Sequence, residues 1–132
     1  MKTIKQTAYF NATPHEIFEL LMDSEKHAAF TGHKAEISRK KGGSFTAYDG
    51  WIQGRNLEIV KDKKIVQAWR GDDWEKGYYS KAEFKLVKKG RGCKLTFTHT
   101  GVPDKHYKGI NQGWNDHYWE RMKKFLKKRA HD

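Results

Sequence analysis

Residues 110–129 of the chain read INQGWNDHYWERMKKFLKKR, and this stretch decides the fold. Its apolar side chains recur at spacings of three and four residues, as they do on one face of an α-helix. They are Ile110, Trp114, Tyr118, Met122 and Phe125. Lysines occupy much of the remaining surface. The pattern predicts one long amphipathic helix, and its apolar face needs an apolar partner elsewhere in the chain.

The partner surface is predicted from a series of strand-like stretches joined by tight turns. They cover residues 35–40, 44–50, 51–60, 64–70, 78–87 and 93–102. In the fifth stretch Ala82, Phe84 and Leu86 face one way, while the charged residues between them face the other. Such alternation indicates an antiparallel sheet with one face in water and the other covered. Residues 1–10 alternate loosely and add a further strand.

Two short helices are predicted between the first strand and the others. Residues 13–23 read TPHEIFELLMD, in which Thr13 is a natural N-cap and Glu16 completes a capping box. A proline at the first helical position strengthens this start. A second helix over residues 24–30 ends near Gly32. The expected order is therefore one strand, two short helices, six strands and one long helix.

The length of the last helix sets the shape of the sheet. A sheet that covers a helix of about 20 residues has to curl around it, and Gly50 and Gly54 are placed to permit the bend. The predicted class is α+β, a curved antiparallel sheet wrapped around a long C-terminal helix, with two short helices after the first strand. The 132 residues fit a single domain over residues 1–132.

The charge of the chain is strongly positive, with 27 Lys and Arg against 16 Asp and Glu and a net charge of +11. Such a surplus favours acidic partners, nucleic acid among them. The lysines are spread through nearly every turn, which indicates a solubilising surface and no specific nucleic-acid site.

No apolar run approaches the ~20 residues of a membrane span, so no membrane insertion is expected. The single cysteine, Cys93, excludes an internal disulfide and fits a cytoplasmic location.

Three segments carry a resemblance to a known family: DGWIQGRNLEIVKDKKIVQAWRGDDWEKGYYSKAEFKLV at 49–87, GCKLTFTHTGVP at 92–103 and GWNDHYW at 113–119. In order and spacing they resemble the C-terminal domain of activators of the heat-shock protein 90 ATPase. The resemblance implies the helix-grip fold of the START/Bet v 1-like (SRPBCC) superfamily and a heat-shock protein 90 homologue as partner. The eukaryotic activators also carry a separate N-terminal domain that contacts the chaperone, so co-chaperone activity is left open for this chain.

The resemblance also implies a cavity, because the superfamily commonly holds an apolar ligand between the curled sheet and the long helix. The residues expected to bind an apolar or aromatic small molecule there are Phe45, Ile52, Trp69, Phe84, Phe97, His99, Trp114 and Tyr118. Those expected at the cavity rim are Phe30, Trp74 and Tyr78. The alternative is a packed core, in which each of these large rings buries roughly 150–250 Å².

The corner IVQAWRGDDWEKGYYS, residues 65–80, places two tryptophans around one turn. Trp69 is expected to pack beneath the long helix near Trp114. Trp74 either covers one end of the core or forms a lip over the cavity, and the first interpretation is favoured. Arg70 is expected in an ion pair with the aspartates that follow it.

Catalysis of the polyketide-cyclase type would need acid–base groups converging on the cavity. His99, Tyr118 and Asn56 are the groups that the sequence offers, without an inward carboxylate. Metal-ligand spacing is absent among the scattered histidines, which are His15, His27, His33, His99, His106, His117 and His131. The sequence thus predicts a ligand-binding domain without catalysis, metal or cofactor. A co-chaperone module that stimulates the heat-shock protein 90 ATPase is the alternative, ahead of a polyketide-cyclase-type enzyme.

Overall fold

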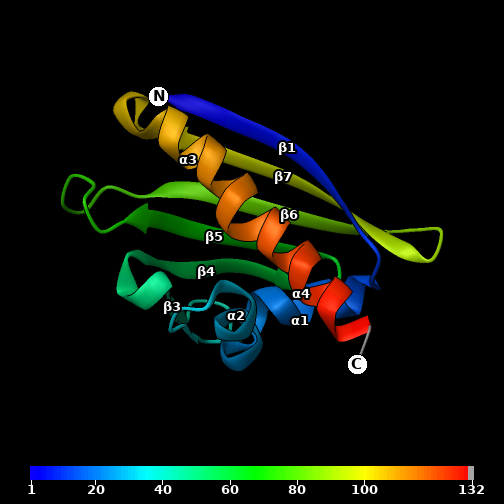
Figure 1. The fold of residues 1–132 in the computed structure, drawn as a ribbon. Helices are drawn as coiled ribbons and strands as arrows, with labels where there is room; N and C mark the ends of the chain where they lie inside the picture. Colours follow the sequence, from blue (N-terminus) through cyan, green and yellow to red (C-terminus); the bar gives the residue numbers. More distant parts are fainter. Residues whose placement is uncertain (131–132) are drawn as a thin grey trace.

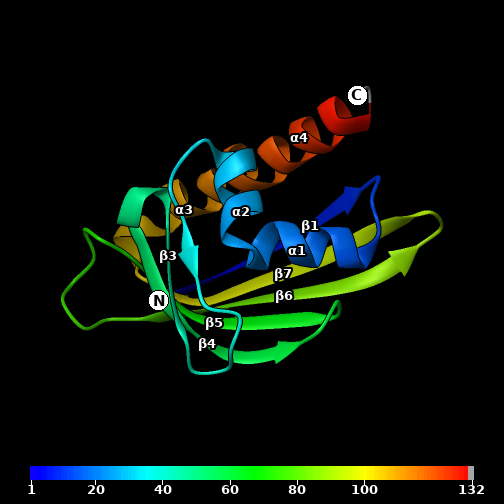
Figure 2. The same cartoon turned by 90° about the horizontal axis from the view of Figure 1, so that it is seen from below.

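The computed structural model describes residues 1–130 and contains a seven-stranded antiparallel sheet with the helices on one face (Figure 1, Figure 2). The strands lie in the order β1-β7-β6-β5-β4-β3-β2. Their bounds are β1 Lys2–Phe10, β2 Glu36–Ile37, β3 Ser44–Ala47, β4 Ile52–Val60, β5 Lys64–Gly71, β6 Ser80–Lys89 and β7 Gly92–Val102. The predicted order of elements is confirmed. His131, one of the scattered histidines, lies outside the described residues.

The two short helices begin and end at the predicted signals. Helix α1 (Pro14–Met22) has its capping box: the Thr13 hydroxyl accepts the Glu16 N–H at 3.1 Å, and the Glu16 carboxylate accepts the Thr13 N–H at 3.0 Å. Helix α2 (Ser24–Thr31) ends at Gly32, whose φ of 78° is the left-handed conformation that glycine adopts freely. Helix α1 packs on β6 and β7, and α2 packs on the end of the long helix.

The long C-terminal helix contains a π-helical turn. It consists of α3 (Tyr107–Trp114), the π-helical segment η3 (Asn115–Trp119) and α4 (Glu120–Ala130), which follow one another directly. In Figure 1 it crosses the sheet diagonally. The wider turn places two adjacent side chains, Tyr118 and Trp119, in the core together. The sequence spacing predicted the helix from residue 110, but it begins three residues earlier.

The apolar face predicted from helical spacing did not include two residues of this helix that are buried. Trp119 is buried, and its indole N–H donates to the side-chain oxygen of Gln6 in β1 at 2.7 Å. Leu126 is buried as well, whereas Phe125, which the pattern assigned to the apolar face, is half-buried. The extra residue in η3 shifts the phase of every position after it, and this shift explains the difference.

Glycine permits the close strand contacts that the curled sheet needs (Figure 2). A Cβ atom at Gly54 in β4 would lie 1.9 Å from the carbonyl oxygen of Ala68 and 2.6 Å from the ring of Phe45. Gly50 has a φ of 94° and ends the short 3₁₀ turn η1 (Tyr48–Gly50) just before β4 begins. Both glycines that were expected to permit the bend therefore have a steric or conformational need to be glycine.

The core lies between the helices and the inward side of the strands. Phe84 of β6 is paired with Phe97 of β7, and Leu86 with Leu95, and all four side chains are buried. The residues between them on β6 and β7 face outward, as the alternation predicted. In the described part of the chain no helix is both long enough and apolar enough to cross a bilayer.

The corner after β5 packs as expected at one residue and differently at another. Trp69 lies beneath the long helix, with its ring centroid 5.5 Å from that of Trp114, which confirms the prediction. Arg70 makes no ion pair with a carboxylate in residues 1–130, so that prediction is wrong. Its guanidinium donates instead to the carbonyl oxygen of Trp74 at 2.7 Å and to the side-chain oxygen of Gln53 at 3.1 Å. The turn aims its carbonyl oxygens at the arginine, which therefore holds the corner closed.

Candidate functional site

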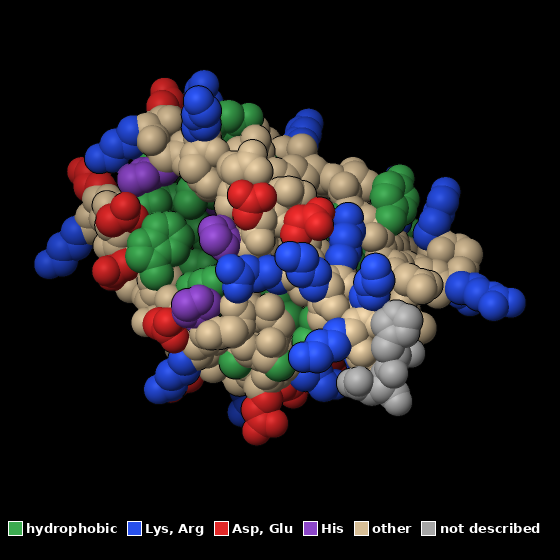
Figure 3. All heavy atoms as spheres, in the orientation of Figure 1, with side chains coloured by type: hydrophobic (Ala, Val, Ile, Leu, Met, Phe, Trp, Pro, Cys, Tyr) green, Lys and Arg blue, Asp and Glu red, His purple; other side chains and the backbone are tan. Residues whose placement is uncertain are grey.

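A cleft of about 600 Å³ opens between the long helix and the β4 side of the sheet. Its apolar walls are formed by Trp51, Ile52, Trp69, Ile110, Trp114 and Tyr118. Figure 3 shows a hollow with hydrophobic side chains on this face of the molecule, beside histidine and basic side chains. The size and the mostly apolar lining are typical of small-molecule sites, which measure about 300–1,000 Å³.

An exposed tryptophan stands at the mouth of this cleft. Trp51 is 39% exposed, although its ring packs edge-on against Trp69 with centroids 6.3 Å apart. Trp69 is buried and contacts Trp114 on the opposite wall. The cleft thus runs from a partly exposed ring to two buried ones, with apolar side chains on both of its walls.

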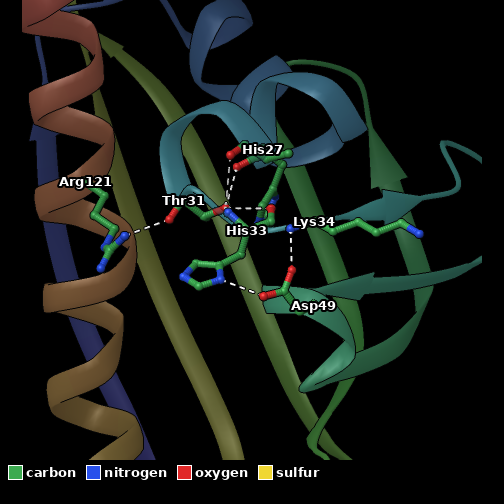
Figure 4. A network of polar contacts seen from close by, with 7 residues as sticks. His27, Thr31, His33, Lys34, Asp49 and Arg121 are labelled. Atoms are coloured by element: carbon green, nitrogen blue, oxygen red, sulfur yellow. Dashed lines mark hydrogen bonds and ion pairs between the residues drawn. The ribbon is translucent and has the colours of Figure 1, made fainter.

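The rim at the α4 end of the cleft is polar (Figure 4). Asp49 accepts hydrogen bonds from the ring nitrogen Nδ1 of His33 at 2.7 Å and from the backbone N–H of Lys34 at 2.8 Å. These bonds, the one from His33 foremost, hold the pKa of the Asp49 carboxyl below its ordinary value. The guanidinium of Arg121 donates to the carbonyl oxygen of Thr31 at 2.7 Å. The rim carboxylate therefore has both oxygens occupied, while the arginine is anchored by a neutral carbonyl.

The backbone of this rim is held in an uncommon conformation. Tyr48 and Asp49 have φ values of 50° and 58°, in the left-handed region that costs a residue with a Cβ atom about 1 kcal/mol or more. Side-chain bonds offset that cost, because the Tyr48 hydroxyl donates to the carbonyl oxygen of His117 on the long helix. Burial raises the pKa of Tyr48 to about 12, against an opposing effect of nearby Arg121. Tyr48 therefore stays protonated and ties η1 to the helix across the cleft.

A chain of buried hydrogen bonds supports the wall of the cleft from behind. The indole N–H of Trp114 donates to Nδ1 of His99 at 3.0 Å. Ser80 donates its hydroxyl proton to the Trp69 carbonyl oxygen at 2.7 Å, so Nε2 of His99 is the donor to the Ser80 oxygen, also at 2.7 Å. This pattern requires a neutral His99 with its proton on Nε2, and burial lowers its pKa to about 3. The chain fixes the ring of Trp114 through its indole N–H and the backbone of Trp69 through its carbonyl, while the Trp69 ring is held by packing.

A second buried histidine fixes the tyrosine of the wall. The Tyr118 hydroxyl donates to Nε2 of His27 at 2.9 Å, and Nδ1 of His27 faces the Leu21 carbonyl oxygen at 3.4 Å. Burial lowers the pKa of His27 to about 4 and raises that of Tyr118 well above its ordinary value. Both side chains are therefore neutral at physiological pH, and their polar atoms face each other and not the cleft.

The structure divides the eight predicted ligand-binding residues into two groups. Ile52, Trp69, Trp114 and Tyr118 line the cleft. Phe45, Phe84, Phe97 and His99 do not line it and are buried in the core. A void of about 10 Å³ between the two groups has room for about one water molecule. The deep core is thus packed, and the open space lies nearer the surface than the sequence suggested.

The three predicted rim residues lie outside the cleft lining. Phe30 and Trp74 are buried, and Tyr78 is half-buried and donates its hydroxyl to the Gly101 carbonyl oxygen at 2.6 Å. Trp74 stacks on His106 with centroids 5.6 Å apart, and His106 does line the cleft. Contact of any of these three residues with a ligand stays a prediction.

Most polar residues of the cleft were missed by sequence reasoning. They are His33, Tyr48, Asp49, Lys105, His106, His117 and Arg121. A weak signal was present in the run Tyr48-Asp49-Gly50 before Trp51, because an Asp-Gly pair favours a left-handed turn and a tryptophan next to a turn needs a packing partner. Nothing in the sequence showed that this turn faces the long helix.

The three acid–base groups considered for catalysis are all engaged by other residues. His99 and Tyr118 bond within the chains described above. The amide of Asn56 donates to the Ser38 carbonyl oxygen at 2.7 Å and accepts from the Gln67 amide at 3.2 Å. Among residues 1–130 no three histidine, cysteine or acidic side chains are grouped as metal ligands.

A curled antiparallel sheet, a long helix across it and a cleft between them define a helix-grip domain. The chain belongs to the family described as Activator of Hsp90 ATPase homolog 1-like protein, whose model matches residues 11–127. It is 30% identical over 123 residues to the Activator of 90 kDa heat shock protein ATPase homolog of Dictyostelium discoideum, covering 92% of this chain and 32% of the relative. The human homolog 1 is 29% identical over 121 residues, covering 92% and 35%. The chain thus spans about a third of the length of these curated relatives.

Solved structures show the same fold. The crystal structure of an HSP90 activator from Plasmodium falciparum has a TM-score of 0.89 at 26% identity and covers 96% of both chains. The solution structure of the Aha1 dimer from Colwellia psychrerythraea has a TM-score of 0.74 at 15% identity, covering 87% of this chain and 89% of that one. The helix-grip fold expected from the sequence is therefore confirmed.

Proposed function

We propose that this domain binds an apolar or aromatic small molecule in its cleft and does not catalyse a reaction. The observation that carries this proposal is the cleft of about 600 Å³ whose walls include Trp51, Trp69 and Trp114. A ligand placed there removes apolar surface from water on both of its faces and can pack against indole rings. The hydrogen-bonded ring of Trp114 and the buried, packed ring of Trp69 support the proposal, since preformed walls reduce the entropy lost on binding.

The absence of catalysis is part of the same proposal. A general base needs an available lone pair within reach of its substrate. The Nδ1 lone pair of His99 accepts the indole N–H of Trp114, and Nε2 of His27 accepts the hydroxyl of Tyr118. Hydrogen bonds from His33 and from the Lys34 N–H lower the pKa of Asp49, the carboxylate of the rim, and so make it a weaker base. These groups are suited to holding the walls of a binding site.

Tryptophan fluorescence tests this function, because three of the five tryptophans line the cleft. Titration with a chemically diverse panel of lipophilic compounds should change the emission with saturation for some of them. Native mass spectrometry of protein purified from its own host should show a retained small molecule. A Gly113→Leu variant, which places a leucine in the cleft lining, should weaken binding, whereas Gln112→Leu outside the lining should not. A flat titration across the whole panel would contradict the proposal.

A second function, interaction with a heat-shock protein 90 homologue, is favoured by the comparisons. The P. falciparum protein, of whose chain 96% is covered, is named an HSP90 activator. The curated relatives are named activators of this ATPase. The basic surface of the chain, with a net charge of +11, would attract an acidic partner most strongly at low salt. We would measure binding to the host chaperone and its ATP turnover. Absence of binding at low ionic strength would exclude this function.

A further inference from the structure

The charged groups that line the cleft are unequal in number and in pairing. Its cations are Lys105 and Arg121, and its carboxylate is Asp49. Asp49 accepts hydrogen bonds from the His33 ring and from the Lys34 N–H, so both of its oxygens are already engaged at the rim. Within residues 1–130, neither Lys105 nor Arg121 forms an ion pair. The cleft therefore presents uncompensated positive charge beside apolar walls.

Arg121 is the better placed of these two cations. It is partly buried at the start of α4, whereas Lys105 is exposed. One of its N–H groups donates to the Thr31 carbonyl oxygen, which fixes the guanidinium at the rim near His33 (Figure 4). A guanidinium has five N–H donors in a planar fork. In the described part of the chain the others have no hydrogen-bond partner, so they can receive an oxygen anion.

The apolar wall extends from this arginine along the helix. The helical residues of the lining are Gly109, Ile110, Gly113, Trp114, His117, Tyr118 and Arg121. From Gly109 to Arg121 they follow one face of the helix over twelve residue steps, a length of about 18 Å at ~1.5 Å per residue. Gly113 leaves room in the middle of this face for a flat body. The cleft thus has the form of a mostly apolar trough with the anchored guanidinium of Arg121 at one end and the exposed Lys105 toward the other.

We propose, on the basis of the small-molecule function above, that the ligand is an apolar or aromatic molecule with one carboxylate, which the guanidinium of Arg121 receives. The indole walls hold the body of the ligand, and the N–H groups of the arginine fork donate to the two carboxylate oxygens side by side. Charge-assisted bonds of this kind are about twice as strong as neutral ones when water is partly excluded. A neutral ligand of the same shape would leave the arginine without an anion.

Two probes of the same shape test this inference, 2-naphthoate and the neutral 2-naphthamide. Isothermal titration calorimetry should show that the carboxylate binds about tenfold more tightly or better. The Arg121→Gln variant should lose this preference, with little change in the affinity for the amide. Arg121→Lys keeps the charge without the fork and should fall between the two. Because Arg121 also bonds to Thr31, the amide affinity in each variant reports whether the cleft is intact.

The matched control is Lys124→Gln on the same helix. Lys124 is exposed and outside the cleft lining, so its loss removes the same charge from the protein without touching the site. The preference for the carboxylate should stay within about twofold of the unmodified protein, because exposed charges at a distance are screened by salt. An equal loss of preference in this control would mean that net charge, and not Arg121, selects the anion, and would overturn the inference.

The other outcomes separate this inference from the function on which it rests. If both probes bind equally, or Arg121→Gln keeps the preference, a binding cleft stands and the carboxylate site is refuted. If the lipophilic panel and both probes fail to bind, both proposals are refuted. If sedimentation shows that a second copy of the chain covers the cleft and excludes both probes, the occupant is protein and the inference is likewise refuted.

Discussion

Acid should destabilise this protein well before its carboxylates are protonated, because two histidines are buried in neutral form. Burial lowers the pKa of His99 to about 3 and that of His27 to about 4. In the unfolded chain a histidine titrates near ~6.5. Between these values the unfolded state binds more protons than the folded state, so the free energy of unfolding falls as the pH falls. The contribution of the two neutral histidines to stability is fully present above the pKa of the unfolded chain, and it is lost progressively as the pH falls toward the pKa values of the folded protein.

The size of the effect follows from the pKa values. At about pH 5 an unfolded histidine is almost fully protonated, while both folded pKa values still lie below the pH. Each buried histidine then contributes a loss of about 2 kcal/mol relative to pH 7, and the pair contributes about 4 kcal/mol. Domains of this size are commonly stable by only about 5–15 kcal/mol. The loss is therefore large enough to measure by chemical denaturation.

The assay is urea denaturation followed by tryptophan fluorescence at about pH 8, 7 and 5. The His99→Gln variant removes one titrating group, so its loss between pH 7 and 5 should be about half that of the unmodified protein. Its stability at pH 7 will also fall, because the packing of the imidazole ring against Trp69 and Phe97 is lost, but this fall in stability does not change with pH. Between pH 8 and 7 the free energy of unfolding of both proteins should change little and by nearly the same amount. If the free energy of unfolding of the variant falls between pH 7 and 5 by as much as that of the unmodified protein, the assignment of a neutral buried His99 is refuted.

Two further changes test the local structure by urea denaturation. Thr13→Ala removes the N-cap bond to the Glu16 N–H and should lower the free energy of unfolding by about 1 kcal/mol, and an unchanged value would contradict the capping role. Gly54→Ala should cost about 2 kcal/mol or more, because its Cβ would overlap the Ala68 carbonyl oxygen. Gly109→Ala is its control: nothing lies within 4 Å of that Cβ, and alanine should stabilise the helix by up to ~1 kcal/mol. Equal effects of the two glycine replacements would refute the steric argument.

Features set by neighbours in the sequence were predicted correctly. The capping box of Thr13 joins residues three positions apart, and the glycine that ends α2 acts on its own helix. The alternation around Phe84 and Phe97 needs only the two-residue period of a strand. These rules operate within a few residues, so a single sequence is enough to apply them.

Features set by distant contacts were missed. The pair of His33 and Asp49 spans 16 positions, and it lines a cleft only because the long helix passes over η1. Trp119 was missed because a 3.6-residue period does not register the extra residue of a π-helical turn. Two adjacent large aromatic residues, Tyr118 and Trp119, were the available sign that one turn of the helix is wider than usual.

The proposed cleft is tested most directly by the indole N–H signals of the five tryptophans in a ¹⁵N-labelled sample. Trp51, Trp69 and Trp114 line the cleft, whereas Trp74 and Trp119 do not. On titration with 2-naphthoate, the first three signals should show the large shifts, saturating together, and the other two should move little. Shifts that are equal across all five signals, or confined to Trp74 and Trp119, would contradict a ligand site in this cleft.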